Sequence, residues 1–315
     1  MNHEQVTAGR SIQRRTGKTF YLATRLLPER VRHPTYVLYG FFRIADEVVD
    51  EPDGRSPDEQ RARLERIRAQ ALGEIPTDDP ILDAFQELRI EHDIPDSEVD
   101  AFIDAMVSDI ETDRYETVDE LDAYMRGSAA AVGAMMTAIM GPTDPETAMP
   151  HAHRLGEAFQ LTNFIRDVRE DVLERDRIYI PRETLSAHGA TLESIERLEF
   201  TPAVRDAVAA ELQRTEARYR AGVAGIRHLP EDCQFPVLLA AVLYVDHHRL
   251  VRDQGYDVLS TRPSLSRWEK IRCLVRTWWH WRLHHDPEIV FERASAVPAE
   301  GPEPRAGYRG ELPSR

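Results

Sequence analysis

Lysine is almost absent from this chain of 315 residues. Lys18 and Lys270 are the only two, so subtracting them from the 40 basic residues leaves 38 arginines, against 55 acidic residues and a formal net charge of -15. Nucleic acid is a disfavoured partner, because its phosphates need a basic surface. Two explanations of the composition stay open: adaptation to a high-salt cytosol, in which screening removes self-repulsion, and a codon usage that favours arginine.

Cysteine and long apolar runs are also scarce. Cys233 and Cys273 are the only cysteines and no CxxC occurs, which argues against a disulfide framework or a zinc site and favours a reducing cytosol. The longest apolar runs, residues 129–140 and 236–245, are shorter than the roughly 20 residues of a spanning helix. Residues 1–20 lack the apolar centre of a signal peptide. We therefore expect a cytoplasmic protein.

Helical periodicity covers almost the whole chain, and no convincing alternation of apolar and polar residues predicts a strand. The sequence predicts an all-α protein with one helical domain over residues 18–290. It is preceded by a tail, residues 1–17, and followed by residues 291–315, which we expect to be disordered because their apolar content is low. The predicted helices that bear most on function span residues 33–49, 118–140, 145–174, 235–254 and 266–282.

Two aspartate pairs share one spacing: Asp46 and Asp50 in RIADEVVDE, and Asp167 and Asp171 in QLTNFIRDVREDV. On a helix, residues i and i+4 face the same way, so each pair forms a stripe of carboxylates, and Asn163 extends the second stripe by a turn. Such a face in a cleft needs cations between its charges. Mg²⁺ is the natural candidate and Mn²⁺ the second, because a hard cation takes carboxylate oxygens and shares its other positions with water and phosphate.

A solvated helix face is the ordinary explanation of one such pair. Both pairs, however, are surrounded by large apolar residues, and each has an arginine just before it, Arg43 in the first segment and Arg166 in the second. A guanidinium can neutralise a carboxylate or bind phosphate oxygens in a bidentate manner. The repeated pattern therefore favours a site for an anionic, metal-bound substrate.

Longer segments around the pairs carry a family resemblance. KTFYLATRLLPERVRHPTYVLYGFFRIADEVVDE and QLTNFIRDVREDVLERDRIYIPRE resemble the two signatures of the squalene and phytoene synthase family, and LLAAVLYVDHHRLVRDQGYDVLSTRPSLSRWEKI resembles a weaker third region. The resemblance extends from about Lys18 to about Arg282, and RIYIP is closer to phytoene synthases. It implies a single-domain helical bundle of the isoprenoid-synthase type, with the two pairs facing each other across a central cavity.

The resemblance also implies roles for individual residues. Asp46, Asp50, Asp167 and Asp171 would be catalytic and would bind Mg²⁺ together with Asn163, and Tyr124 stands at the position of the catalytic tyrosine. The residues expected to bind substrate are Lys18, Thr19, Tyr39, Arg43, Gln160, Asn163, Arg166 and Arg262. Those expected to line the prenyl channel are Ala130, Val132 and Gly133.

Each of these assignments has a plainer alternative. Buried polar packing would account for Asn163 and Gln160, close helix packing for residues 129–133, and a surface position for Arg262. Arg126 and Ser128 depart from the family pattern and put the polarity of the channel in question. Arg177 and Tyr179 would close over the second pair.

The function implied is Mg²⁺-dependent head-to-head condensation of two prenyl diphosphates. The first hypothesis is a phytoene synthase, a prenyltransferase of carotenoid biosynthesis that converts two geranylgeranyl diphosphates through a cyclopropyl diphosphate. A squalene or dehydrosqualene synthase acting on farnesyl diphosphate is the runner-up, and NADPH is expected only if squalene is made. A terpene cyclase and a non-catalytic helical scaffold are more distant alternatives.

Two further partners follow from these hypotheses. Downstream carotenoid enzymes are candidates to receive the product. The segment SRWEKIRCLVRTWWHWRL is basic and rich in tryptophan, so it either packs against the bundle, the favoured interpretation, or makes a peripheral contact with the inner face of the membrane.

Overall fold

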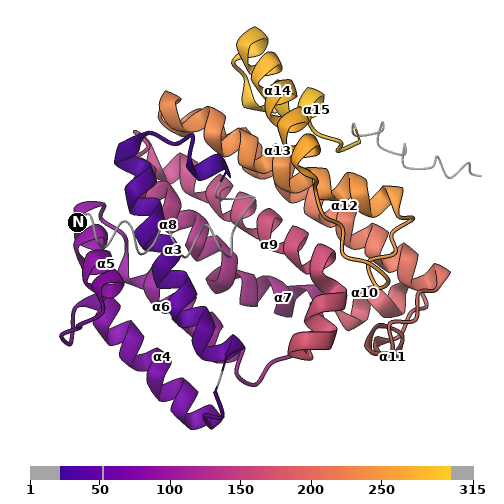
Figure 1. The fold of residues 1–315 in the computed structure, drawn as a ribbon, viewed down its shortest axis with the longest axis horizontal. Coiled ribbons are helices and arrows are strands. Elements are labelled where there is room, and N and C mark those ends of the chain that lie inside the picture. The colour runs from indigo at the N-terminus through magenta and orange to yellow at the C-terminus, as the bar shows by residue number, and fades with distance from the viewer. Residues whose placement is uncertain (1–21, 52, 299–315) are drawn as a thin grey trace, which may run out of the picture.

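The computed structural model describes residues 22–51 and 53–298, and helices dominate this part of the chain (Figure 1). Its only β-type pairing within these ranges is an isolated bridge between Arg114 and Ile178. The predicted all-α class is therefore confirmed. The N-terminal tail, Lys18, Thr19 and residues 299–315 lie outside the described residues.

The helices follow one another with short connections. In chain order they are α3 (Glu29–Asp50), α4 (Pro57–Leu72), α5 (Pro80–Glu91), α6 (Asp96–Ser108), α7 (Val118–Met125), the π-helical turn η1 (Arg126–Ala130), α8 (Ala131–Met140), α9 (Pro145–Arg175), α10 (Arg182–Ala187), α11 (Leu192–Glu196), α12 (Pro202–Ala224), the 3₁₀ turn η2 (Gly225–His228), α13 (Glu231–Asp253), α14 (Arg267–His284) and α15 (Pro287–Ala294).

Helix α9 runs through the middle of the bundle and carries the second aspartate pair (Figure 1). It begins where the Asp144 side chain accepts a hydrogen bond from the Thr147 N–H at 3.2 Å, with Pro145 in the first turn, where a missing N–H costs nothing. Its 31 residues span about 46 Å at 1.5 Å per residue. The helix packs on α8 and on α12, so it joins the two halves of the molecule.

Two of the four apolar clusters of the described residues lie on either side of this axis and serve here as its N-terminal and C-terminal cores. The N-terminal core joins α3 to α4, α5, α6 and α8, and its centre is Phe41, whose ring stacks on Phe85 with 4.1 Å between the centroids. The C-terminal core joins α9 to α12, α13 and α15 around residues such as Tyr219 and Leu239. The first aspartate pair therefore stands on the N-terminal half, and the second stands on the shared helix.

The segment predicted as one helix over residues 118–140 is interrupted. A π-helical turn, Arg126–Ala130, separates α7 from α8. Gly127 in this turn lies against α6 so closely that a Cβ atom would be 2.1 Å from the Ala101 carbonyl oxygen. The close approach of α6 thus requires glycine here, and the wider turn changes which side chains face the interior.

The C-terminal boundary differs from the expected one. Residue 290 falls inside α15, whose Phe291 and Ala294 are buried in the C-terminal core. Asp286 starts this helix by accepting hydrogen bonds from the Glu288 and Ile289 N–H groups, both at 3.0 Å. An aspartate cap followed by proline is a typical start of a helix. The predicted boundary was based on composition alone and did not use this signal. No helix in the described ranges has the length and apolarity needed to cross a membrane.

Candidate active site

Both aspartate pairs line one cavity of about 590 Å³ between the C-terminal turns of α3 and the second half of α9, which we call the polar cavity. Its acidic lining residues are Asp46, Asp50, Asp109, Asp167, Glu170 and Asp171. Its basic lining residues are Arg43, Arg166, Arg175, Arg177 and Arg262. Two helices that are far apart in the sequence therefore bring their carboxylates to the same space.

The first pair is held by Arg43, one turn earlier on α3. Arg43 Nη1 donates to Asp46 Oδ2 at 2.6 Å, and its other nitrogens reach Glu47 and Glu51. Burial and the neighbouring Asp50 together raise the pKa of Asp46 to about 6, although Arg43 opposes the rise. The Asp46 side chain remains partly open to the cavity.

The second pair meets cations from two directions. Arg166 Nε donates to Asp167 Oδ1 at 2.6 Å, and Arg262, 95 residues later in the chain, donates from Nε to the same oxygen at 2.7 Å. Arg262 also lies 2.6 Å from Glu170 Oε2 through Nη1. The structure thus places Arg262 at the second pair and not on a remote surface.

Two arginines after the second pair reach Asp50 of the first pair, and one of them, Arg175, also contacts the second pair. Arg175 Nη1 donates to Asp171 at 3.0 Å, while its Nε lies 3.6 Å from Asp50 Oδ2. Arg177 Nη1 donates to Asp50 at 3.4 Å, and its Nη2 donates to the Asp109 carbonyl oxygen at 2.8 Å. Burial raises the pKa of Asp171 to about 7, against the effect of Arg175.

Tyr124 of α7 meets a carboxylate that the sequence analysis did not single out. Its hydroxyl donates to Asp109 Oδ2 at 2.9 Å, and burial raises the pKa of Asp109 to about 7. The other oxygen, Asp109 Oδ1, is buried without a hydrogen-bond partner among the described residues. Around this pair lie aromatic rings: Tyr179 stacks on Phe164 at 3.7 Å between centroids, and Tyr124 lies 6.2 Å from Tyr179.

The donor set fits a divalent cation shared with a phosphorylated substrate. No group of three or more His, Cys, Asp or Glu side chains in the described ranges is arranged as a preformed metal site. Mg²⁺ does not need one, because it keeps several non-protein ligands, commonly water and phosphate oxygens. Asp109 Oδ1 is left without a hydrogen-bond partner among the described residues, and burial raises the pKa values of Asp46 and Asp171, so a bound cation would favour their charged forms.

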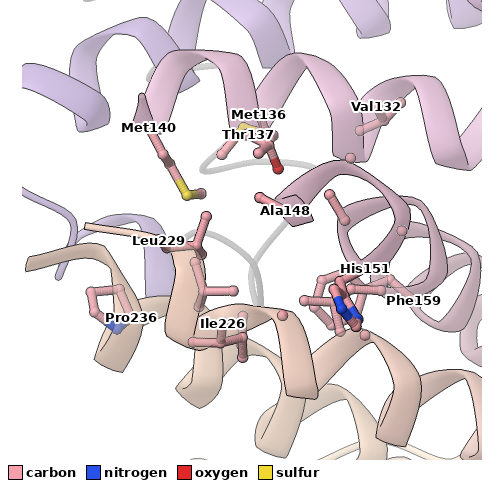
Figure 2. A pocket seen from close by; sticks show the side chains of 18 of the residues that line it. Val132, Met136, Thr137, Met140, Ala148, His151, Phe159, Ile226, Leu229 and Pro236 are labelled. Carbon is pink, nitrogen blue, oxygen red and sulfur yellow. The ribbon is translucent and has the colours of Figure 1, made fainter. Parts of the chain in front are cut away.

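The polar cavity adjoins two further spaces. The middle cavity, about 640 Å³, shares Tyr39, Gln160 and Asn163 with it. The apolar cavity, about 110 Å³, shares Phe159 and Met136 with the middle one. Figure 2 shows the apolar cavity lined by residues of α8, α9, α13 and the η2 region, with Met140 and Leu229 at one side and His151 and Phe159 at the other. The three spaces thus run from charged to apolar.

Of the three residues predicted to line the prenyl channel, two line a cavity and one does not. Val132 lines all three cavities, and Gly133 lines the apolar one. Gly133 is also a close-packing position, because a Cβ atom there would lie 2.5 Å from the Ala152 carbonyl oxygen. Ala130 is buried and lines none of the three, whereas Ala129 lines the middle cavity. The π-helical turn, absent from the predicted continuous helix, accounts for this change of register.

The departure from the family pattern at Arg126 leaves the channel unaffected. Arg126 makes two hydrogen bonds of 2.8 Å to the Glu98 carboxylate and lines none of the three cavities. Ser128 does line the polar and middle cavities, and its buried hydroxyl has no partner among the described residues. Only Ser128 therefore alters the polarity of the cavity wall.

Three charged residues of the polar cavity were not among the predicted site residues: Asp109, Glu170 and Arg175. Arg175 and Glu170 continue the helical stripe of the second pair at i+4 from Asp171 and i+3 from Asp167, so their spacing was a usable signal. Asp109 carries no such signal, because its side-chain partner in the site, Tyr124, is contributed by α7.

Comparison with known proteins decides the family. The Squalene/phytoene synthase family matches residues 13–269. The chain belongs to this family. Its members are prenyltransferases, so the predicted family and enzyme class are confirmed.

Curated relatives of similar length bear the same name. The phytoene synthase of Thermus thermophilus is 33% identical over 273 residues, which cover 86% of this chain and 91% of the relative. The phytoene synthase of Arthrospira platensis is 31% identical over 285 residues, which cover 84% and 89%. These relatives favour the first functional hypothesis over the runner-up.

Solved structures share the fold. A dehydrosqualene synthase in complex with a ligand superposes with a TM-score of 0.80 at 24% identity and covers 89% of this chain and 98% of its own. The squalene synthase HpnC from Alicyclobacillus acidocaldarius gives a TM-score of 0.72 at 27% identity, with 80% and 95% covered. The predicted isoprenoid-synthase-type bundle is therefore confirmed.

Proposed function

We propose that the protein condenses two geranylgeranyl diphosphates head to head and forms phytoene through a cyclopropyl diphosphate. One observation carries the proposal: carboxylate pairs from α3 and α9 face one polar cavity, which adjoins spaces that become apolar. Diphosphates would occupy the charged end, and prenyl chains would extend past Val132 towards the apolar end. The named relatives support phytoene as the product.

Diphosphate binding would use metal and arginine together. Divalent-metal dependence belongs to the family, and we propose Mg²⁺, with Mn²⁺ as the second candidate, held by the two aspartate pairs and Asn163. A bound cation would stabilise the negative charge of the departing diphosphate. Arg43, Arg166 and Arg262, which already contact the carboxylates, would turn to phosphate oxygens, since a guanidinium binds phosphate in a bidentate manner.

The aromatic wall would protect the allylic cation that ionisation leaves. Phe164, Tyr179 and Tyr124 line the polar cavity, and Phe164 and Tyr179 stack on each other; aromatic rings at such a wall would attract a cation and exclude water. The hydrogen bond to Asp109 fixes the phenol of Tyr124 at this wall. We therefore assign Tyr124 a catalytic role beside the reacting carbon atoms and Asp109 the role of positioning it.

The remaining predicted residues would orient the substrates. Tyr39, Gln160 and Asn163 line both the polar and the middle cavity, so they stand where diphosphate and prenyl chain meet. Lys18 and Thr19 stay proposals from the family resemblance alone. The hydrocarbon would pass to downstream carotenoid enzymes.

A product assay tests the assignment. Purified protein, Mg²⁺ and labelled geranylgeranyl or farnesyl diphosphate are incubated with and without NADPH, and the hydrocarbon is identified. Phytoene formed from the longer substrate without NADPH is the expected result. Squalene or dehydrosqualene from farnesyl diphosphate alone would support the runner-up, and intact substrates would indicate a scaffold.

A further inference from the structure

All four tryptophans of the chain lie on one helix, α14 (Arg267–His284). The inner side of this helix packs on α13 and α15 through Cys273 and Thr277, and Trp281 is half buried beside Phe235. The other three tryptophans are exposed, Trp268 at 79% and Trp279 at 58%. A single helix therefore presents most of the exposed aromatic surface of the described chain.

The exposed apolar residues of α14 form one continuous side of the helix. At 100° per residue they fall within an arc of about 140°. We call this side the outer face; it consists of Trp268, Ile271, Arg272, Val275, Trp278, Trp279, Arg282 and Leu283, all of which are exposed. Contiguous apolar surface of this kind on a folded protein marks a site of interaction.

The charge of α14 is opposite to that of the rest of the chain. The helix contains five basic residues and one acidic residue, within a protein of net charge -15. The acidic residue, Glu269, points to the body of the molecule, where it accepts hydrogen bonds from Arg249 at 2.8 Å and from the Ser266 N–H at 2.8 Å. Arg272 and Arg282 of the outer face form no ion pair with another described residue. The outer face is thus apolar and cationic, without an acidic side chain.

We propose that α14 docks the protein on an anionic lipid bilayer, with its outer face in the interfacial layer. Tryptophan and arginine suit that layer, because the indole ring is apolar with one polar N–H and the guanidinium pairs with lipid phosphate. The helix would lie on the membrane and not cross it, since no helix in the described ranges is both long and apolar enough to do so. A second copy of this chain is a poorer occupant of the outer face. If it bound through its acidic surface, that surface would have to bury the tryptophans, and if it bound through its own α14, the arginines of the two helices would repel each other.

The place of α14 in the fold connects docking with the cavities. The helix stands at the edge of the bundle, at the end opposite to α4 (Figure 1). Its first turn nevertheless reaches the middle cavity, which Lys270 lines together with Arg262 and Leu265. Docking would hold that cavity near lipid, into which an apolar product could leave. This last step rests on the proposed function, whereas docking itself does not.

Vesicle flotation tests the proposal with the full chain, at the lowest KCl concentration at which circular dichroism shows a folded protein. Vesicles of phosphatidylcholine with an equal part of phosphatidylglycerol are compared with phosphatidylcholine alone. We expect the protein to float with the anionic vesicles and to float at least about fivefold less with the neutral ones. Failure to float with anionic vesicles would overturn the proposal.

Variants locate the contact. Trp278→Ser with Trp279→Ser, and separately Arg272→Gln with Arg282→Gln, should each reduce the bound fraction at least about fivefold. The matched controls are Ile90→Ser, an apolar residue of α5 that is 70% exposed, and Arg63→Gln with Arg66→Gln on the exposed side of α4. The controls should bind as the wild type does. Equal binding by the α14 variants would overturn the proposal.

Intrinsic fluorescence reports on α14 alone, since no other element contains tryptophan. Anionic vesicles should shift the emission to shorter wavelength, and brominated acyl chains should quench it.

Light scattering of the protein without vesicles tests whether the outer face binds a second copy of the chain instead of lipid. The proposal is wrong if two results occur together: the tryptophan variant forms a particle of lower mass than the wild type, and vesicles leave the wild-type emission unchanged. The outer face would then be an interface between copies of the chain. Diphosphate release by the tryptophan variant in detergent should equal that of the wild type, which separates docking from catalysis.

Discussion

Arg175 of α9 lies 3.6 Å from Asp50 of α3, measured from Nε to Oδ2, while its Nη1 donates to Asp171 at 3.0 Å. One guanidinium therefore links the two carboxylate pairs. It lies between them, where a divalent cation and diphosphate are expected.

Replacing this arginine should expose the repulsion between the pairs. We expect Arg175→Gln to lower the melting temperature of the metal-free protein and to enlarge the rise produced by Mg²⁺ with inorganic diphosphate, because Asp50 and Asp171 lose their internal cation. Differential scanning fluorimetry measures both. Arg89→Gln, which removes an ion pair to Asp96 outside the cavities, is the control and should leave the ligand-induced rise unchanged. An unchanged rise in Arg175→Gln would contradict the bridging role.

The aspartates themselves separate catalysis from stability. Asp46→Asn and Asp167→Asn should each reduce turnover at least about a hundredfold, because each removes a proposed metal ligand. The fold should persist without loss of melting temperature, since each change also removes a charge from a crowded cavity. Asp104→Asn, on the exposed ion pair with Arg68, serves as the control for both readouts. Turnover within threefold of the wild type in either cavity variant would refute the metal assignment.

Tyr124 has a matched neighbour for comparison. Tyr124 donates to Asp109, whereas the Tyr115 hydroxyl is buried without a partner among the described residues. We expect Tyr124→Phe to lower kcat about tenfold or more with little change in KM, and Tyr115→Phe to change kcat less than threefold. Asp109→Asn, which keeps a hydrogen-bond acceptor for the phenol, should retain more activity than Asp109→Ala. Equal effects of the two phenylalanine variants would show that Tyr124 serves packing only.

The buried side chain of His247 should make the folded protein less stable in acid. Burial, together with the nearby Arg166, lowers its pKa to about 4, whereas an unfolded histidine titrates near 6.5. Between these values the unfolded chain binds a proton that the folded chain does not, so stability is present above about pH 6.5 and is lost as the pH falls towards 4. The effect is up to about 3 kcal/mol at the low end.

His247→Asn isolates this effect, because an amide can keep the hydrogen bond that the ring makes to the Tyr244 carbonyl at 3.0 Å. Urea unfolding at pH 7.5 and pH 5 should show a smaller acid loss in the variant than in the wild type. His188→Asn is the control, an exposed histidine with a similar bond of 2.9 Å to the Thr184 carbonyl. Parallel losses in the wild type and His247→Asn would contradict the prediction.

Salt dependence distinguishes the two explanations of the arginine-rich, acidic composition. If the protein is adapted to high salt, its melting temperature should rise markedly from dilute buffer to molar KCl, because screening weakens the repulsion of a net charge of -15. Equal melting temperatures would favour codon usage instead.

Local spacing in the sequence predicted one wall of the site well. The positions of Asn163, Asp167 and Asp171 on one stripe follow from helical geometry alone, and the structure places all three on the same cavity. The same stripe predicts Arg175 one turn later. Helix α9 was predictable because its capping Asp144 and Pro145 are unambiguous start signals.

Contacts between distant segments could not be predicted in this way. Asp109 meets Tyr124 in the polar cavity because α7 packs beside it, and Ala130, which lines none of the three cavities, belongs to the π-helical turn after α7. The turn depends on the close approach of α6 at Gly127, which is a tertiary contact. Periodicity describes the face of one helix, whereas these features depend on which helices meet.

The stoichiometry of diphosphate release tests most directly whether both carboxylate pairs act on one condensation. With Mg²⁺ and geranylgeranyl diphosphate, and without NADPH, inorganic diphosphate and hydrocarbon are measured in the same reaction. The account predicts two diphosphates for each phytoene, with both yields lost together in Asp46→Asn and in Asp167→Asn. One diphosphate for each product molecule, as head-to-tail elongation or cyclisation would give, would contradict it.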